Sequence, residues 1–294
     1  MQADPSQHQF DAGGVELAYF EWGNPGSPVI LLVHATGFHA RCWDRTIASL
    51  VGDYRIIAPD LRGHGRSARQ EPYVWSAFTR DLELLVDALH IRDAIGVGHS
   101  LGGHCVSQLA ANRPGTFKRL LLVDPVILDP QAYSKERYAS FGGPEDHPVA
   151  RRRNHWSSWQ EMFEKFRDRH PFSLWQPEAL LDYCRFGLRP SMDGEGFELA
   201  CPPVVEASIY LGNTRSDIYE RLGQIAIPVV VLRAKARDPD AHDIMDFASS
   251  PTWESLAEAF PNGRDVYLPQ LSHFMPMQDP QLTARFIADE HALP

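Results

Sequence analysis

The feature that most constrains the fold is an alternation, along the first 125 residues, of short apolar runs with segments of helical periodicity. Short apolar runs such as "VILLVH" and "LLLVDP" are typical of parallel strands that are covered on both faces. Segments with apolar residues at helical spacing predict amphipathic helices. The expected strands are 15–23, 29–34, 54–60, 94–98 and 117–125, and the expected helices are 75–90 and 101–114. This alternation predicts an α/β protein with a mostly parallel, doubly wound sheet.

The alternation stops after Pro125 and returns near Ile227. The intervening residues contain no continuous strand-like run, are rich in aromatics and arginines, and have helical spacing over 156–167 and 177–187. The later part predicts strands at 227–235 and 264–269 and helices at 253–260 and 281–289. We therefore expect a core made of residues 1–125 and 224–294, with a helical cap of residues 126–223 inserted after the strand 117–125. Insertions of this kind often lie over an active site.

Composition excludes several classes of function. The 294 residues carry a net charge of −10, whereas nucleic-acid-binding proteins usually present a basic face. No apolar run approaches the length of a membrane span, and the polar N-terminus lacks a signal pattern, so we expect a cytoplasmic protein. We expect it to be a monomer or a homodimer. The four cysteines are scattered, which does not favour a disulfide framework. No metal-binding or cofactor-binding motif is present, so we expect neither group.

The segment "GVGHSLGGHC" contains the candidate nucleophile. Gly98-His99-Ser100-Leu101-Gly102 fits the pattern G-x-S-x-G, and it lies between an expected strand and an expected helix. A nucleophilic serine at such a sharp turn needs small residues on either side. The helix that follows would direct free N–H groups toward developing negative charge. The alternative is that Ser100 only turns the chain and caps the helix.

A serine nucleophile needs a base and a carboxylate that orients the base. His273, in "LPQLSHFMPMQDP", follows the last expected strand and is the candidate base. Asp238 is the preferred acid because it comes soonest after the strand that follows the insertion. Asp240 and Asp243 in the same segment remain alternatives. Asp124 is a further alternative, because it ends the strand "LLLVDP" and would also lie at the carboxyl edge of the sheet.

Two backbone N–H groups are needed to stabilise the oxyanion. We assign them to Leu101, which follows the nucleophile, and to Thr36, in the loop after "VILLVH". The segment "DLRGHGRS" looks catalytic, but its glycines and Asp60 favour a structural loop in which Asp60 binds backbone amides. His34 and His99 are expected to pack beside the site.

Several motifs together resemble those of the α/β-hydrolase superfamily. They are "LLVHATGF", "RIIAPDLRGHGRS", "GHSLGG", "RDPD" and "LSHFMPMQDP", in the order usual for that family. The resemblance implies the α/β-hydrolase fold with a cap domain. It also implies a Ser100–His273–Asp238 triad and an oxyanion hole formed by the backbone of Leu101 and Thr36.

Such a triad implies acyl transfer through an acyl-enzyme, with a small-molecule ester or lactone as the partner. The alternatives are a lactonase, a hydrolase of carbon–carbon bonds in ring-cleavage products, and a ligand receptor with slow turnover. Arg151–Arg153 could attract a substrate carboxylate or could be a solvated face. The aromatic residues of the cap could equally form its own core. The candidate substrate-binding residues are Phe38, His99, Trp156, Trp159 and Met275.

Overall fold

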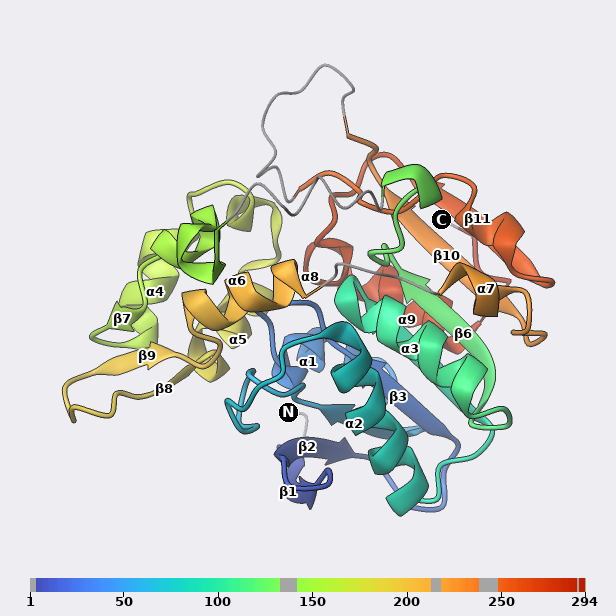
Figure 1. Ribbon diagram of the computed structural model, residues 1–294, viewed down its shortest axis with the longest axis horizontal. Helices are drawn as coiled ribbons and strands as arrows, with labels where there is room; N and C mark the ends of the chain where they lie inside the picture. Colours follow the sequence, from blue (N-terminus) through green and yellow to red (C-terminus); the bar gives the residue numbers. More distant parts are fainter. Residues whose placement is uncertain (1–3, 133–141, 213–217, 238–247, 290, 294) are drawn as a thin grey trace.

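The computed structural model describes residues 4–132, 142–212, 218–237, 248–289 and 291–293. Its centre is an eight-stranded sheet in the order β1-β2-β4-β3-β5-β6-β10-β11 (Figure 1). The strands from β4 to β11 in this order run parallel, and β1 and β2 are antiparallel. The strands are β1 (Ser6–Asp11), β2 (Glu16–Trp22), β3 (Val29–Val33), β4 (Arg55–Pro59), β5 (Ala94–His99), β6 (Phe117–Val123), β10 (Val229–Ala234) and β11 (Gly263–Leu268).

Helices cover both faces of this sheet because its central strands are apolar on both sides. In β3, Leu31 and Val33 pack in one buried cluster with α2 and α3, whereas Ile30 and Leu32 pack in a second cluster with α1 and α9. This two-sided burial explains the continuous apolar runs in the sequence. The helices of these two layers are α1 (Asp44–Ile47), α2 (Trp75–Ala88), α3 (Leu101–Asn112), α7 (Tyr219–Leu222), α8 (Met275–Gln278) and α9 (Pro280–Ala288).

The segment between β6 and β10 contains most of the remaining elements, and those from β7 to α6 lie together on the left of the view (Figure 1). Two helices expected there are found, one four residues shorter than predicted (159–166 instead of 156–167) and one a single residue shorter (177–186 instead of 177–187). A small antiparallel sheet, in the order β7-β9-β8, was not predicted. The elements are α4 (Trp159–Phe166), α5 (Pro177–Phe186), α6 (Pro203–Leu211), β7 (His155–Trp156), β8 (Leu188–Pro190) and β9 (Phe197–Leu199).

The predicted mostly parallel α/β sheet is confirmed, with three local differences. Strand β1 is added at the edge of the sheet by pairing with β2, although its sequence is polar. The helix expected over 253–260 is reduced to a 3-10 turn, Leu256–Ala259. Helix α7 falls inside the predicted cap but contributes Leu222 to the buried core cluster that contains α3. The division of the chain at residues 126 and 223 stays a prediction.

All four cysteines are free thiols and are buried, in agreement with their scattered positions. In the described part of the chain, no helix has both the length and the apolar character that crossing a membrane requires.

Candidate active site

Ser100 lies at the turn that joins β5 to α3, in a conformation rarely adopted by residues other than glycine. Its φ is 56° and its ψ is −119°. The neighbouring backbone makes this turn very tight: a Cβ atom on Gly98 would overlap the Gly102 carbonyl, and one on Gly102 would overlap the Val33 carbonyl. The G-x-S-x-G pattern therefore reflects a steric requirement that holds Ser100 at the carboxyl edge of the sheet.

His273 is held beside Ser100 by the segment between β11 and α8. Its Nε2 lies 3.0 Å from the Ser100 hydroxyl oxygen. Its backbone is fixed on both sides: the His273 N–H donates to the Ala248 carbonyl at 2.7 Å, and the His99 Nε2–H donates to the His273 carbonyl at 2.8 Å. Burial, together with the neighbouring His273, keeps the pKa of His99 well below its usual range, so His99 is a neutral support.

The carboxylate that accepts from the imidazole is Asp124. His273 Nδ1 lies 2.6 Å from Asp124 Oδ2, and Asp124 is completely buried at the end of β6. The other oxygen, Oδ1, accepts from the Ala234 N–H at 2.9 Å and the Ser250 hydroxyl at 2.6 Å. Asp124 itself has a φ of 43°, which turns the chain sharply as the strand ends. Both carboxylate oxygens are thus fixed, and one of them is directed at His273.

The carboxylate in this contact is Asp124, whereas the sequence analysis preferred Asp238. Asp238, Asp240 and Asp243 lie outside the described residues. The Nδ1 atom of His273 has one hydrogen, and it is donated to Asp124, the alternative that the sequence analysis had left open. Asp124 directly follows β6, and Ser100 directly follows the neighbouring parallel strand β5, so the two residues lie at the same edge of the sheet. Asp124 needs no intervening loop to reach the imidazole.

The loop after β3 is supported by neutral histidines and an aspartate. The Gly37 N–H donates to His64 Nε2 at 3.0 Å, and the Leu61 N–H donates to His34 Nε2 at 3.0 Å. Burial lowers the pKa of His34 to about 3 and that of His64 well below its usual value, so both rings can accept these bonds. Asp60 accepts from the Ala40 N–H and from the Arg66 N–H, both at 2.7 Å. The expectation that Asp60 binds backbone amides is therefore confirmed.

The oxyanion donors assigned from the sequence lie in suitable places. Leu101 is the first residue of α3, and the first N–H groups of a helix have no acceptor within it. Thr36 lies in the loop after β3 and lines the same cavity as Ser100. Their backbone N–H groups remain the predicted pair of donors.

A cavity of about 890 Å³ lies over Ser100 and His273. Phe38 and Trp156 line it, as expected from the sequence. The other three candidate binding residues lie outside its lining: His99 supports His273, Trp159 packs in the aromatic cluster of the inserted segment, and Met275 is buried in the core. The aromatic residues of the inserted segment therefore divide between lining the cavity and forming a local core.

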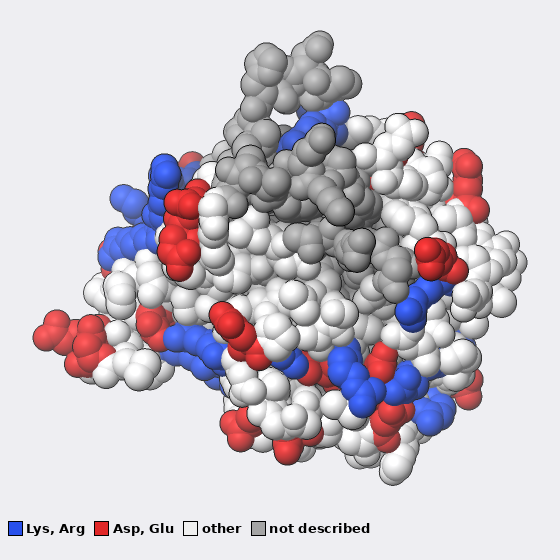
Figure 2. All heavy atoms as spheres, in the orientation of Figure 1, with Lys and Arg blue, Asp and Glu red and all other residues white. Residues whose placement is uncertain are grey.

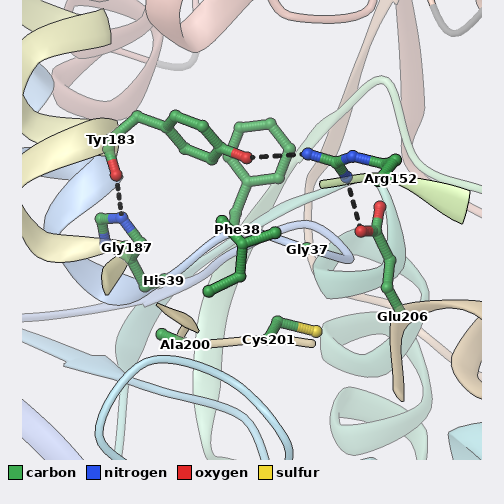
Figure 3. Close-up of a pocket in the computed structure, with 10 residues that line it drawn as sticks. Gly37, Phe38, His39, Arg152, Tyr183, Gly187, Ala200, Cys201 and Glu206 are labelled. Carbon is green, nitrogen blue, oxygen red and sulfur yellow. Dashed lines mark hydrogen bonds and ion pairs between the residues drawn. The ribbon is translucent and has the colours of Figure 1, made fainter. Parts of the chain in front are cut away.

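One contact from the inserted segment reaches the loop after β3 and was not expected from the sequence. Figure 3 shows Arg152 between the Tyr183 hydroxyl and the Glu206 carboxylate, beside Gly37 and Phe38. A Cβ atom on Gly37 would lie 2.8 Å from Glu206 Oε1, so the carboxylate packs directly against this glycine. Burial raises the pKa of Glu206, and Arg152 opposes that shift. Within the described residues, no group of His, Cys, Asp and Glu side chains has a metal-binding arrangement.

Comparisons with known proteins identify the family of the chain. Residues 30–286 match the model of the alpha/beta hydrolase family, so the chain belongs to that family. Lipase LipV of Mycobacterium tuberculosis is 35% identical over 113 residues, which are 38% of this chain and 43% of that protein. The 3-hydroxybutyrate-oligomer hydrolase of Cupriavidus necator is 34% identical over 117 residues, 38% of this chain and 40% of that protein. The chain thus matches about two fifths of the length of these relatives.

Solved structures are similar over almost the whole chain. E-2-(acetamidomethylene)succinate hydrolase has a TM-score of 0.74 at 20% identity, with 97% of this chain and 98% of that chain covered. The enol-lactonase from Burkholderia xenovorans LB400 has a TM-score of 0.68 at 19% identity, with 96% and 98% covered. At these identities the similarity establishes the α/β-hydrolase fold.

Proposed function

We propose that the protein hydrolyses carboxylic esters, open-chain or cyclic, through an acyl-enzyme on Ser100. The observation that carries this proposal is the continuous hydrogen-bonded series from Ser100 through His273 to Asp124, which opens into a large cavity. A serine in this setting is activated because the imidazole removes its proton while the buried carboxylate stabilises the imidazolium.

The first half of the reaction forms the acyl-enzyme. The Ser100 hydroxyl donates its proton to His273 Nε2 while its oxygen attacks the ester carbonyl carbon. The tetrahedral intermediate places its negative oxygen near the N–H groups of Leu101 and Thr36, which stabilise it. His273 then gives the proton to the leaving alkoxide oxygen, the carbon–oxygen bond breaks, and the alcohol departs.

The second half regenerates the enzyme. A water molecule donates its proton to His273 Nε2 and attacks the acyl carbon, which forms a second tetrahedral intermediate in the same oxyanion hole. The proton returns to Ser100 as the carboxylic acid is released. Throughout both steps Asp124 holds Nδ1–H toward itself, which keeps Nε2 directed at Ser100.

The cavity supports substrates with an apolar body. Its volume of about 890 Å³ suits a small or medium-sized ligand, and its aromatic lining includes Phe38, Trp156 and Phe172. We propose that residues 126–223 act as the cap that supplies much of this wall. The matching relatives include proteins named as a lipase and an oligomer hydrolase, and the similar structures include an enol-lactonase, so open and cyclic esters are the first candidates.

The proposal is tested by a hydrolysis screen of the wild-type protein and the variant Ser100→Ala. The panel contains p-nitrophenyl esters of graded acyl length and lactones of graded ring size. Ser107→Ala is a matched control, because Ser107 is a buried serine of the same helix that donates to the Gly103 carbonyl at 2.9 Å, outside the cavity lining. We expect turnover that is lost in Ser100→Ala and retained in Ser107→Ala.

The alternatives give different results in the same screen. A lactonase cleaves the cyclic esters faster than the open ones. If the protein turns over neither the open nor the cyclic esters but cleaves a carbon–carbon bond in a ring-cleavage product, then carbon–carbon bond hydrolysis is its reaction and ester hydrolysis is not. A single stoichiometric burst of p-nitrophenol followed by very slow release indicates a slow-turnover receptor. Equal activity of wild-type and Ser100→Ala proteins refutes the role of Ser100.

A further inference from the structure

The described lining of the cavity has a charge opposite to that of the chain. It contains six cationic side chains, from arginine and lysine, and three carboxylates, although the whole chain carries a net charge of −10. Figure 2 shows Lys and Arg side chains gathered over α4, on the left of the view. An excess of cations around a cavity attracts anions and raises their local concentration.

Most of these cations already have partners. Arg152 pairs with Glu206, and Arg233 forms a two-point ion pair with Asp265. Arg153 pairs with Glu161 at 2.7 Å and lies over the Trp156 ring. Arg237 also has a contact of its own. These residues therefore do not account for a free anion-binding group, and two of the three arginines expected from the sequence to attract a carboxylate are already occupied.

Lys165 and Arg169 are different. Both line the cavity, both are exposed, and no described carboxylate lies within ion-pair distance of either one. Lys165 is in the last turn of α4, and Arg169 lies three residues beyond the end of that helix. Because both line the same cavity, an anion bound between them would gain a charge-assisted hydrogen bond from each cation.

The same wall is aromatic next to these two cations. Phe166 of α4 stacks on Phe172 with ring centroids 4.4 Å apart, and both rings line the cavity with Lys165 and Arg169. The cavity is continuous with Ser100. Its lining therefore offers a nucleophile, an apolar wall and two cations that have no carboxylate partner among the described residues.

We propose that Lys165 and Arg169 form a subsite for a carboxylate carried by the substrate, so that the favoured substrates are anionic esters with an apolar segment between the carboxylate and the scissile bond. This inference rests on the proposed ester hydrolysis at Ser100. The carboxylate takes no part in the reaction, and its ion pairs position the acyl carbon at Ser100.

The test compares two substrates of equal chain length, p-nitrophenyl hexanoate and mono-p-nitrophenyl adipate. The variants are Lys165→Gln, Arg169→Gln and the double variant. Arg167→Gln is the matched control, because Arg167 lies in the same stretch, pairs with Glu164 and is outside the cavity lining. We expect the double variant to lower kcat/KM for the adipate ester about tenfold, since exposed ion pairs each contribute a factor of roughly 1.4 to 5. The hexanoate value should stay within about twofold, by the same estimate.

The outcomes separate this inference from the proposed function. Hydrolysis of both esters that depends on Ser100 but is unaffected in the double variant overturns the carboxylate subsite and leaves the ester hydrolase intact. If the wild-type protein cleaves neither of these esters nor any member of the ester and lactone panel, the proposed function fails. The subsite is then decided by whether adipate, but not 1,6-hexanediol, protects Ser100 from a fluorophosphonate label. Protection that is lost in the double variant supports the subsite, and its absence refutes it.

Discussion

The two walls of the cavity are built on different principles. On the sheet side, the polar side chains of the candidate site have fixed protein partners: both oxygens of Asp124, both ring nitrogens of His273 and both ring nitrogens of His64 are hydrogen-bonded. On the α4 side, aromatic rings stack on one another and the exposed Lys165 and Arg169 have no described ion-pair partner. The sheet side therefore fixes the positions of the reacting groups, and the α4 side presents positive charge to a bound substrate.

This difference assigns separate tasks to the two walls. A fixed network suits the chemical steps, because a misplacement of about 1 Å in a reacting group can cost about a hundredfold in rate. A wall of aromatic rings and exposed cations suits substrate selection, because its side chains can be substituted without displacing the reacting atoms. Variants of the sheet side should therefore affect all substrates alike, and variants of the α4 side should change the order of preference.

The largest effect is expected for His273→Ala. It removes the base, so kcat should fall by at least about 10⁴-fold for every ester in the panel. Because Ser100 and His273 act as one unit, the double variant Ser100→Ala/His273→Ala should be no worse than either single variant. Steady-state kinetics with neutral and anionic esters measure kcat for the single and double variants and so test both expectations. A loss that is confined to one substrate would remove the distinction between the two walls.

A smaller loss is expected for Gly37→Ala. Gly37 has a φ of +78°, and an added Cβ would press against the Glu206 carboxylate, which would displace the loop that holds Thr36. We expect kcat to fall roughly a hundredfold for all substrates, the size of effect seen when one oxyanion donor is lost.

Gly115→Ala is the matched control, because Gly115 has a φ of +85° and open space around its Cβ position. It should cost about 1 kcal/mol of stability from backbone strain, with unchanged activity. Urea unfolding of both variants measures the cost of backbone strain, and esterase assays measure the effect of the added Cβ on the site. If Gly37→Ala loses only stability, the loop after β3 does not position the oxyanion donors.

Glu206→Gln tests the contact between the inserted segment and the loop after β3. The substitution leaves the Arg152 guanidinium without its carboxylate beside the loop after β3, so kcat should fall about tenfold and the free energy of unfolding should fall by about 2 kcal/mol. Glu198→Gln is the matched control, because Glu198 pairs with Arg69 and is outside the cavity lining. A change in KM alone for Glu206→Gln would place this carboxylate with the substrate wall.

The sequence predicted the sheet side better than the opposite wall. Ser100 was identifiable because its tight turn requires glycines at fixed spacing, and His273 was identifiable from chain order. Chain order favoured Asp238, but it could not predict the contact of His273 with Asp124, because β6 and β10 are neighbouring parallel strands that end at the same edge of the sheet. Asp238 lies outside the described residues. The partners of Asp124, such as Ser250, come from a segment with no recognisable pattern.

The inserted segment was predicted less completely. Helices α4 and α5 were expected from their periodicity, but β7, β8 and β9 are two or three residues long, too short to leave an alternating pattern. The spacing of aromatic residues could not distinguish rings that line the cavity, such as Phe172, from rings that pack locally, such as Trp159. That distinction depends on contacts between elements far apart in the sequence.

The smallest effect concerns the pH dependence of stability. Burial lowers the pKa of His34 to about 3 and of His39 to about 4, and it also lowers those of His64 and His99, whereas unfolded histidines titrate near 6.5. As the pH falls below about 6.5, the unfolded state therefore binds more protons and stability decreases. Asp44 has the opposite effect, because burial raises its pKa to about 6. The folded state therefore binds one proton at Asp44 as the pH falls below about 6, which increases stability.

Urea unfolding at pH 7.5, 6 and 5 measures this trend. Each neutral histidine contributes up to about 1.4 kcal/mol per pH unit, so the midpoint should fall clearly between pH 6 and pH 5. His64→Gln should weaken the pH dependence by about one proton, because one titrating ring is removed. A midpoint that does not change between pH 7.5 and pH 5 would contradict the neutral, hydrogen-bonded state assigned to the histidines of the sheet side.

The most direct test of the central claim compares Asp124→Asn with Asp238→Asn. If Asp124 orients His273, its amide variant should fold, because asparagine has a similar shape. It should lower kcat by about 10³- to 10⁴-fold, since the imidazole loses the carboxylate that fixes its tautomer. Asp238→Asn should retain activity within about twofold, because the proposed mechanism gives Asp238 no role. The opposite result, with activity lost in Asp238→Asn and retained in Asp124→Asn, would contradict the catalytic series proposed for this protein.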